Sequence, residues 1–259
     1  GPIAKDIIEG MEALGLNTFQ GYGLTETSPV ISATCPSHNR PGSVGLPLVN
    51  VQVRIDTPDE NGNGEIVEDY EDIAFLYIRL GLNFLPVDYR GYGHSTGQPS
   101  VSAMLRDAHV VLDYTKQWLN LNGCTGPFIV MGRSLGSASA LELAENYPDL
   151  IDGLIIESGF AHSQTILNLV GVDMKRASIA ESEAFRHIEK IGRFTKPTLI
   201  IHAELDQILP FTDGKDLYEA SGAANKRLLK IPGADHNSIF MVGVSDYMKA
   251  VAKFVEGLR

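Results

Sequence analysis

The sequence is poor in cysteine, with only Cys35 and Cys124 among its 259 residues. The two lie far apart and neither belongs to a C-x-x-C pair, so the sequence predicts neither a disulfide framework nor a zinc site. It also lacks any apolar run near the roughly 18 residues that span a bilayer, and its first residues show no charged and apolar leader. From these absences we expect a cytoplasmic protein that binds no membrane.

Basic residues are in the minority. The chain has 21 Lys and Arg against 32 Asp and Glu, which gives a formal net charge of -11. No basic run is visible, so the charge pattern offers no surface for nucleic acid or for an anionic membrane. The composition, 44% hydrophobic and 20% charged, is typical of a folded globular protein. Small neutral or cationic molecules are the substrates that this charge balance favours.

Helix and strand patterns alternate from about Val67 to the end of the chain. Such alternation at short spacing predicts βαβ units, so we expect an α/β fold with a mostly parallel sheet and helices on both faces. Pro86 is an objection to the first strand, because proline removes a donor from the strand pairing. The expected strands cover residues 83–89, 128–131, 153–157, 198–202 and 227–231, and the expected helices 67–80, 101–120, 135–147, 213–221 and 245–257.

Two segments depart from this alternation. Residues 159–196 are polar and irregular, and they predict either a small insert above the sheet edge, where substrate-selecting lids lie, or a pair of surface helices. Residues 1–62 contain one expected helix at 3–14, a stretch punctuated by glycine and proline, and a short strand at 51–55. We therefore expect two parts, residues 1–62 and residues 63–259.

Ser134 stands at the centre of a G-x-S-x-G pentapeptide, Gly-Arg-Ser-Leu-Gly at 132–136. An apolar strand pattern precedes the pentapeptide and a helix pattern follows it. A serine on such a sharp turn is exposed at the carboxyl edge of a sheet, and the flanking glycines allow the turn. We interpret Ser134 as a nucleophile, with a structural turn serine as the alternative.

A serine hydroxyl needs a base and a group that orients the base. In hydrolases built this way both follow the serine on later strand ends. Asp206 follows the expected strand at 198–202 and fits the acid, whereas His236 follows the strand at 227–231 and fits the base. Their separation by one βα unit predicts neighbouring strand ends.

Other residues compete for these two roles. Glu204 and Asp235 are carboxylates near the predicted acid and base, and we expect them to be solvated or to support the loops. His202 lies inside a strand, where a packed or hydrogen-bonded histidine is expected. Three histidines precede the acid and so break the expected order: His94, His162 and His187. For His162 and His187, which lie in the insert, we expect a surface role, with the lining of a pocket as the alternative.

The developing oxyanion needs two preorganised hydrogen-bond donors, and the loss of one costs about 10²–10³ in rate. The amide of Leu135, at the start of the helix after the nucleophile, is the first expected donor. The second should come from the loop between the third strand and the first helix of such a sheet. In this chain the loop would be residues 61–65.

Residues from about Asn61 to Arg259 resemble the α/β-hydrolase superfamily, in its serine-aminopeptidase-like branch of esterases and thioesterases. The resemblance implies Ser134, Asp206 and His236 as a catalytic triad, Leu135 and Asn63 as oxyanion donors, and no metal or organic cofactor. It rests on Gly-Asn-Gly-Glu at 62–65, Val-Asp-Tyr-Arg-Gly-Tyr-Gly-His-Ser at 87–95, the pentapeptide at 132–136, Glu-Ser-Gly-Phe at 157–160, His-Ala-Glu-Leu-Asp at 202–206 and Gly-Ala-Asp-His at 233–236.

Residues 1–64 resemble something else, an internal fragment of an adenylate-forming acyl-CoA ligase. Gly-Tyr-Gly-Leu-Thr-Glu-Thr at 21–27 matches the adenylate- and magnesium-binding motif of that family, and Arg-Pro-Gly-Ser-Val-Gly-Leu-Pro-Leu at 40–48 continues the pattern. The phosphate-binding loop and the lysine-bearing domain of a ligase are missing, so Thr25 and Glu26 predict no working site. The two resemblances meet at 61–66, which predicts a chimera joined there.

This seam leaves two interpretations of function. In the first, the chain is a serine hydrolase that cleaves a small-molecule carboxylic ester or thioester through an acyl-enzyme on Ser134. In the second, it is a folded but inactive chimera, because Asn61 stands where hydrolases have a histidine and the displaced Asn63 opens the oxyanion hole. Because the first hydrolase strands are missing, we expect residues 51–55, and less firmly 19–21 or 44–46, to pair onto the sheet, or a homo-oligomer to cover its edge.

Overall fold

The computed structural model describes residues 21–22, 32–33, 46–47, 52–54, 67–169 and 184–259. The expected helix at 3–14, the loop that contains Asn63 and the seam at 61–66 lie outside these ranges. Three short antiparallel strands in the N-terminal part form one small sheet: β1 (Gly21–Tyr22), β2 (Ser32–Ala33) and β3 (Leu46–Pro47). The remaining described strands form a second, larger sheet.

The larger sheet is parallel throughout and has the strand order β5-β4-β6-β7-β8-β9. Three central strands are buried along their whole length, which accords with the apolar run at the centre of each. The strands are β4 (Gln52–Arg54), β5 (Leu85–Pro86), β6 (Ile129–Arg133), β7 (Gly153–Glu157), β8 (Thr198–Ala203) and β9 (Lys226–Ile231).

Strand β4, from the segment before residue 62, lies inside this sheet. Val53 pairs with Leu85 of β5 on one side and with Val130 of β6 on the other. The strand expected at 83–89 is shorter than predicted and covers only Leu85–Pro86. Pro86 stands on the edge strand of the described sheet, where a missing backbone N–H is tolerated but ends the pairing.

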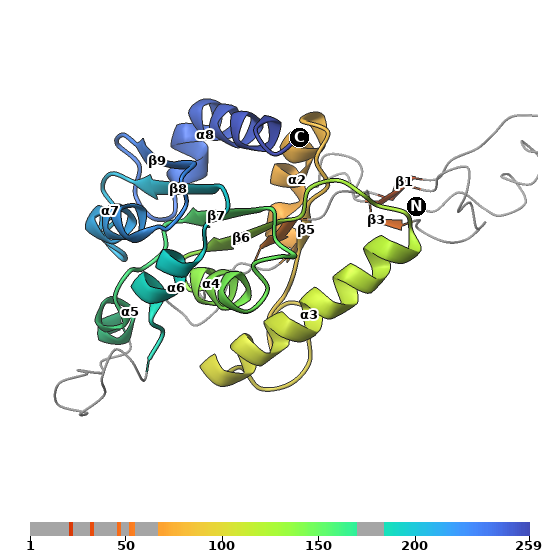
Figure 1. Ribbon diagram of the computed structural model, residues 1–259, viewed down its shortest axis with the longest axis horizontal. Helices are drawn as coiled ribbons and strands as arrows, with labels where there is room; N and C mark the ends of the chain where they lie inside the picture. The colour runs from red at the N-terminus through yellow and green to blue at the C-terminus, as the bar shows by residue number, and fades with distance from the viewer. Residues whose placement is uncertain (1–20, 23–31, 34–45, 48–51, 55–66, 170–183) are drawn as a thin grey trace, which may run out of the picture.

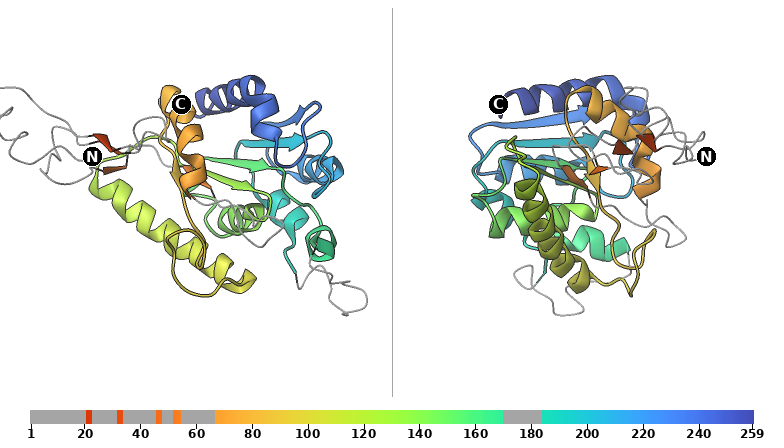
Figure 2. Two further views of the ribbon diagram at one scale, coloured as in Figure 1. Left: turned by 180° about the vertical axis from the view of Figure 1, so that it is seen from behind. Right: turned by 90° about the vertical axis from the view of Figure 1, so that its right-hand side faces the viewer.

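Helices cover both faces of the sheet (Figure 1, Figure 2). Helices α2 and α8 pack on one face, where Tyr77 and Tyr247 join a core with Ile155. Helices α3, α4, α6 and α7 pack on the other face, in a core that contains Leu154 and Ile156. The helical segments are η1 (Val67–Tyr70), α2 (Glu71–Arg79), α3 (Val101–Leu121), α4 (Gly136–Asn146), α5 (Ser163–Leu169), α6 (His187–Arg193), α7 (Phe211–Ala220) and α8 (Ile239–Glu256).

Ile155 of β7 thus faces one core, and its neighbours Leu154 and Ile156 face the other. This follows from strand geometry, because successive side chains point to opposite sides of a sheet. The predicted α/β class with a mostly parallel sheet is therefore confirmed. Helix α8 begins at Ile239 rather than near residue 245. Gly243 is buried in α8, and a Cβ there would come within 2.5 Å of the Ile231 side chain, so the close packing of α8 on β9 requires glycine.

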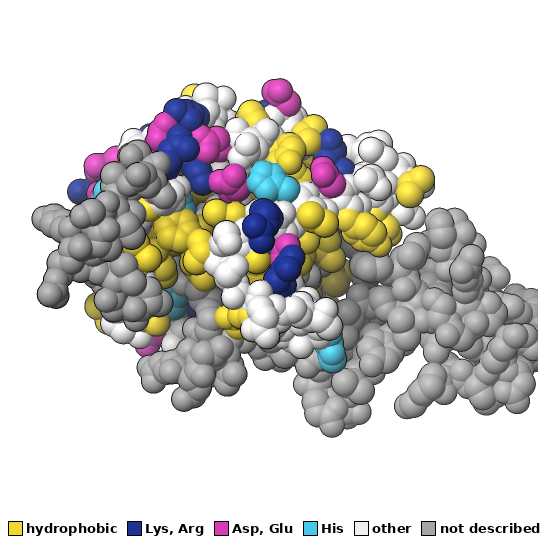
Figure 3. Space-filling model, turned by 90° about the horizontal axis from the view of Figure 1, so that it is seen from below, with side chains coloured by type: hydrophobic (Ala, Val, Ile, Leu, Met, Phe, Trp, Pro, Cys, Tyr) yellow, Lys and Arg dark blue, Asp and Glu magenta, His cyan; other side chains and the backbone are white. Residues whose placement is uncertain are grey.

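The described part of the segment 159–196 contains helices α5 and α6 and no strand. Helix α6 is tied to α4 by ion pairs between Lys190 and Glu142, 2.5 Å, and between Arg193 and Glu145, 2.6 Å. Figure 3 shows the molecule from below, where apolar side chains gather in patches between clusters of basic and acidic ones. The two ion pairs between α6 and α4 attach the C-terminal part of the insert to the helix that follows Ser134.

Candidate active site

Ser134 lies on the turn between β6 and α4, with a backbone φ of +51°. This left-handed conformation is costly for a residue other than glycine, and it persists only where the surroundings hold it. Here the Ser134 amide donates to the carbonyl oxygen of Glu157 at 2.9 Å, and the Ser134 carbonyl accepts from the Ser137 hydroxyl at 2.6 Å. A Cβ on Gly132 would stand 2.4 Å from the carbonyl oxygen of Gly136, so the turn requires glycine there.

The structure brings the side chains of Ser134, His236 and Asp206 together. Ser134 Oγ lies 3.0 Å from His236 Nε2, and His236 Nδ1 lies 2.8 Å from Asp206 Oδ2. All three residues are buried. An ionised carboxylate only accepts, so Nδ1 carries the proton of a neutral ring and Nε2 is left to accept from the serine hydroxyl.

Asp206 is held by its own loop as well as by the histidine. Its Oδ1 accepts hydrogen bonds from the amides of Ile208 at 3.0 Å and Leu209 at 2.8 Å. Burial alone raises the pKa of Asp206, but the hydrogen bond and charge of His236 and the Leu209 amide outweigh it, and the pKa lies below its usual value. The carboxylate is therefore ionised at neutral pH.

The competing carboxylates are engaged elsewhere. Glu204 accepts from Lys230 Nζ at 2.6 Å and from the Gly233 amide at 3.1 Å. Asp235 accepts from the Ser238 amide at 2.8 Å, just before α8. Both support loops, as the sequence suggested, and neither hydrogen bond involves His236.

The competing histidines differ in burial. His202 is fully buried, and its Nε2 lies 2.8 Å from the carbonyl oxygen of Leu209. His94 and His162 are exposed. The surface role expected for His187 is wrong, because its side chain is fully buried against Phe160. Burial lowers the pKa of His187 to about 3, although its Nδ1 bonds the Phe160 carbonyl oxygen at 2.6 Å.

Of the two expected oxyanion donors, the structure describes only Leu135. It precedes the first turn of α4, directly after Ser134. Among the backbone hydrogen bonds of the described residues, none uses the Leu135 amide, which is what a donor to a substrate oxygen requires. Asn63 lies outside the described residues, in the stretch between β4 and η1.

A buried ion pair next to the nucleophile was missed by the sequence reasoning. Arg133 donates from Nε to Glu157 Oε1 at 3.1 Å and from Nη2 to the carbonyl oxygen of His236 at 2.7 Å. The Tyr247 hydroxyl donates to Glu157 Oε2 at 2.6 Å and lies 3.3 Å from the Tyr77 hydroxyl. The available signal was a pair of opposite charges at the ends of two apolar runs.

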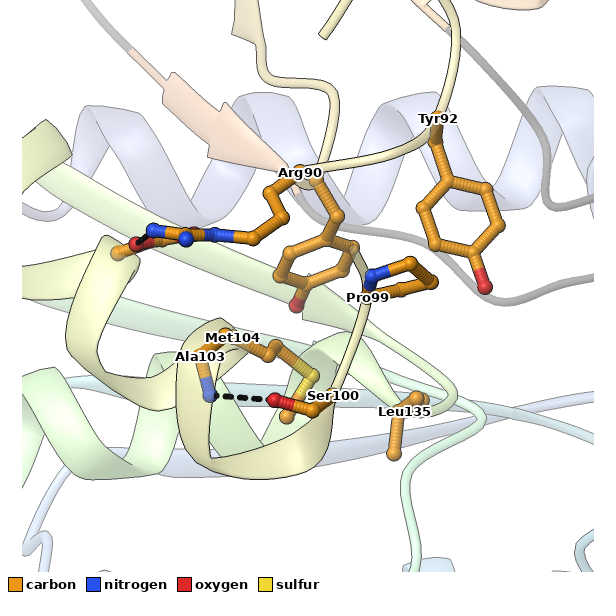
Figure 4. Close-up of a pocket in the computed structure, with 9 residues that line it drawn as sticks. Arg90, Tyr92, Pro99, Ser100, Ala103, Met104 and Leu135 are labelled. Atoms are coloured by element: carbon orange, nitrogen blue, oxygen red, sulfur yellow. Dashed lines mark hydrogen bonds and ion pairs between the residues drawn. The ribbon is translucent and has the colours of Figure 1, made fainter. Parts of the chain in front are cut away.

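A small pocket opens beside Leu135, between α3 and the loop that follows β5 (Figure 4). Arg90 and Asp107 form an ion pair at one wall, with Nη2 and Oδ1 2.5 Å apart. The Ser100 hydroxyl is already used as the cap of α3, where it accepts from the Ala103 amide. The rest of the lining is aromatic or apolar: Tyr89, Tyr92, Pro99, Ala103, Met104 and Leu135.

Comparisons with known proteins decide the fold. The solved structure of a monoacylglycerol lipase from Paleococcus ferrophilus superposes with a TM-score of 0.61 at 19% identity, covering 81% of this chain and 94% of the lipase. Est1E from Butyrivibrio proteoclasticus, solved with ferulic acid, gives a TM-score of 0.63 at 18% identity, over 81% and 89% of the two chains. The chain has the α/β-hydrolase fold.

Sequence comparisons agree with this fold. The family model described as serine aminopeptidase, S33, matches residues 61–188 of the hydrolase-fold chain, and the model described as AMP-binding enzyme matches residues 1–70. The α/β hydrolase domain-containing protein WAV2 of Arabidopsis thaliana is 27% identical over 210 residues, which cover 74% of this chain and 67% of WAV2. The chain spans 58% to 67% of the length of the curated relatives that it matches.

None of the helices in the described ranges has the length and hydrophobicity to span a bilayer. Within the same ranges, no group of three or more His, Cys, Asp or Glu is placed to hold a metal ion.

Proposed function

We propose that the chain is a serine hydrolase that cleaves a carboxylic ester or thioester, with Ser134 as nucleophile. The observation that carries this proposal is the hydrogen-bonded series from Ser134 Oγ through His236 to Asp206, with distances of 3.0 and 2.8 Å. The same three side chains were predicted from the motif context, the chain order and the resemblance to α/β hydrolases. Nucleophile, base and orienting carboxylate in this arrangement have the geometry that acyl transfer requires.

The proposed reaction has two halves. Ser134 Oγ attacks the carbonyl carbon while its proton passes to His236 Nε2, and the Leu135 amide donates to the oxygen that becomes negative. Collapse of the tetrahedral intermediate breaks the bond to the alcohol or thiol, which takes the proton from His236. Water then attacks the carbonyl carbon of the acyl-enzyme while it passes a proton to His236 Nε2. The bond to Ser134 Oγ breaks, and Ser134 takes this proton from His236 as the carboxylic acid is released. Asp206 stays ionised and stabilises the imidazolium in both halves.

The pocket beside Leu135 supports an uncharged substrate. The two charged side chains in its wall, Arg90 and Asp107, form an ion pair and so neutralise each other. The apolar remainder favours an aliphatic or aromatic group next to the reacting carbonyl. A lipase that acts on monoacylglycerols and an esterase solved with ferulic acid are structural neighbours, and their names accord with this class of substrate.

We also propose that the chain is a chimera and that Asn63 supplies the second oxyanion donor. The overlap of the two family matches, at residues 61–70, supports a junction there. It also supports the alternative function, a folded but inactive chimera, because the predicted second donor belongs to that junction. An error of about 1 Å in its position would cost on the order of 100-fold in rate.

Hydrolysis of p-nitrophenyl acetate, butyrate and octanoate, and of a butyryl thioester, tests the proposal. We expect turnover by the wild type and its loss in Ser134→Ala, with Ser102→Ala on the exposed face of α3 as a matched control that keeps full activity. A serine-directed fluorophosphonate separates the alternatives. Labelling of Ser134 without turnover would favour the inactive chimera. Folded protein that shows neither labelling nor turnover would end the hydrolase proposal.

A further inference from the structure

We propose that His202 is a positioning residue for Asp206, which it holds in place through Leu209. The proposal rests on the hydrolase function proposed above, because it concerns the carboxylate that orients His236. Sequence reasoning treated His202 only as a competitor for the base and set it aside as a packed histidine. Its contacts point to a more specific part in the site.

The contacts of Leu209 join His202 to the acid. The Leu209 carbonyl oxygen lies 2.8 Å from His202 Nε2, and the Leu209 amide donates to Asp206 Oδ1, also at 2.8 Å. The backbone of Leu209 is thus fixed on both sides, its carbonyl by the ring and its amide by the carboxylate. With Oδ1 held in this way, Oδ2 is left to face His236 Nδ1 at 2.8 Å.

The protonation state of His202 follows from its partners. A carbonyl oxygen only accepts, so Nε2 must carry a proton. Nδ1 is buried and has no hydrogen-bond partner among the described residues. Burial lowers the pKa of His202, against the opposing effects of the Leu209 carbonyl and the Asp206 charge. His202 is therefore a neutral ring with its proton on Nε2.

Neutrality matters because two imidazoles flank one carboxylate. His202 Nε2 lies 3.6 Å from Asp206 Oδ2, beyond hydrogen-bond reach. A charged His202 would compete with His236 for that oxygen, whereas the neutral ring holds the loop and leaves Oδ2 to the base. The arrangement gives the two histidines different tasks.

Helix α7 packs against the imidazole ring of His202. A Cβ on Gly214 would come within 2.4 Å of His202 Nδ1 and 2.8 Å of its Cγ, so only glycine leaves room for the imidazole. The Phe211 ring meets the imidazole edge-on, with centroids 5.9 Å apart. The position of His202 is thus fixed from the helix side as well as from the loop side.

A pair of amide variants tests the role of Nε2. Glutamine can present an N–H near the position of Nε2, whereas the shorter asparagine presents one near Nδ1. We expect His202→Gln to keep kcat for p-nitrophenyl butyrate within about threefold, and His202→Asn to lose about 10-fold to 100-fold in kcat, as misplacement of a catalytic group does. KM should change little in both, because His202 positions the acid and not the substrate.

A proton NMR signal gives a readout that does not depend on turnover. The His236 Nδ1 proton, shared with Asp206, should resonate far downfield in the wild type and in His202→Gln. It should broaden or vanish in His202→Asn. A residue that served only folding would lower the melting temperature of both variants and leave kcat and this resonance alike in them.

Gly214→Ala approaches the same contact from the opposite side. We expect it to lower kcat about 10-fold in the wild type and less than twofold in the His202→Asn background, where the ring is already gone. Gly192→Ala in α6 is the matched control, because the nearest atom to its added Cβ would be 3.4 Å away. It should keep the wild-type kcat.

The outcomes separate this proposal from the proposed function. A folded wild type without turnover or fluorophosphonate labelling would end the hydrolase proposal, and the downfield resonance alone would then decide the role of His202. A resonance present in the wild type and in His202→Gln but lost in His202→Asn supports positioning. Equal resonances and equal kcat in the two variants, or no such resonance in the wild type, would overturn it.

Discussion

Arg133 donates a hydrogen bond of 2.7 Å from Nη2 to the main-chain carbonyl oxygen of His236. The residue directly before the proposed nucleophile thus fixes the backbone of the proposed base, which follows a different strand. Glu157, in register with Arg133 on β7, lies 3.1 Å from its Nε and balances the buried charge. The distance between Ser134 and His236 should therefore depend on this ion pair.

Arg133→Met should damage both stability and activity. It removes the guanidinium that faces the buried Glu157 carboxylate, and breaking a buried ion pair on one side costs about 3–5 kcal/mol of the free energy of unfolding. Urea unfolding followed by circular dichroism measures this loss. Ester turnover should fall as well, because the loop that carries His236 loses its anchor.

The double variant Arg133→Met/Glu157→Gln separates these two effects. Removal of both charges should recover most of the free energy of unfolding, and the glutamine still offers an oxygen to Tyr247. Turnover should stay at least about 10-fold below the wild type, because the bond to His236 is still missing. If activity recovered together with stability, Arg133 would be a structural residue only.

Asp206→Asn should be far more harmful than the same change at the neighbouring carboxylates. An amide in this place favours the wrong tautomer of the histidine, and in Ser-His-Asp enzymes the change costs about 10⁴ in kcat. Asp235→Asn and Glu204→Gln are matched controls, since both groups bond other partners. Their kcat values should stay within about threefold of the wild type. A comparable loss at Asp235 would mean that the acid has been misassigned.

Strand patterns, chain order and the resemblance to α/β hydrolases predicted the fold class and the three side chains that meet at Ser134. The motifs behind this prediction are local, because an elbow, a strand end and a loop histidine can each be read from a few neighbouring residues. The Arg133 contacts could not be predicted in this way. They depend on the register of β6 against β7 and on the return of the His236 loop, which only the folded chain provides.

The burial of His187 is a second feature that the local sequence did not predict. Its polar neighbours in sequence suggested a surface position, yet Phe160 and Phe185, at centroid distances of 4.1 and 5.5 Å, enclose it. Strand β5 illustrates the opposite case, since the objection raised by Pro86 was visible in the sequence and the strand is indeed shortened. Local chemistry was predictable here, whereas burial by distant residues was not.

The burial of His187 should make stability depend on pH. The folded-state pKa is about 3 against a reference value of 6.5, so between these values the unfolded chain binds a proton that the folded chain does not. Stability should therefore fall as the pH drops below about 6.5, with a contribution from His187 that approaches 1.4 kcal/mol per pH unit. Urea unfolding at pH 7, 6 and 5 measures the slope.

His187→Asn removes this titration while keeping a side-chain amide near the position of Nδ1, from which it can donate to the Phe160 carbonyl oxygen. The free energy of unfolding of the variant should depend less steeply on pH than that of the wild type over the same range. The buried His202, whose pKa is also lowered, should leave a residual slope of the same sign. Identical slopes in the two proteins would show that His187 titrates alike when folded and unfolded.

The central claim, that Ser134 is an activated nucleophile, is tested most directly by intact-mass and peptide-mapping analysis after reaction with a fluorophosphonate. We predict one adduct per chain, located on Ser134, absent in Ser134→Ala and formed far more slowly in His236→Gln. Folded wild-type protein that forms no adduct, or forms it on another residue, would contradict the claim.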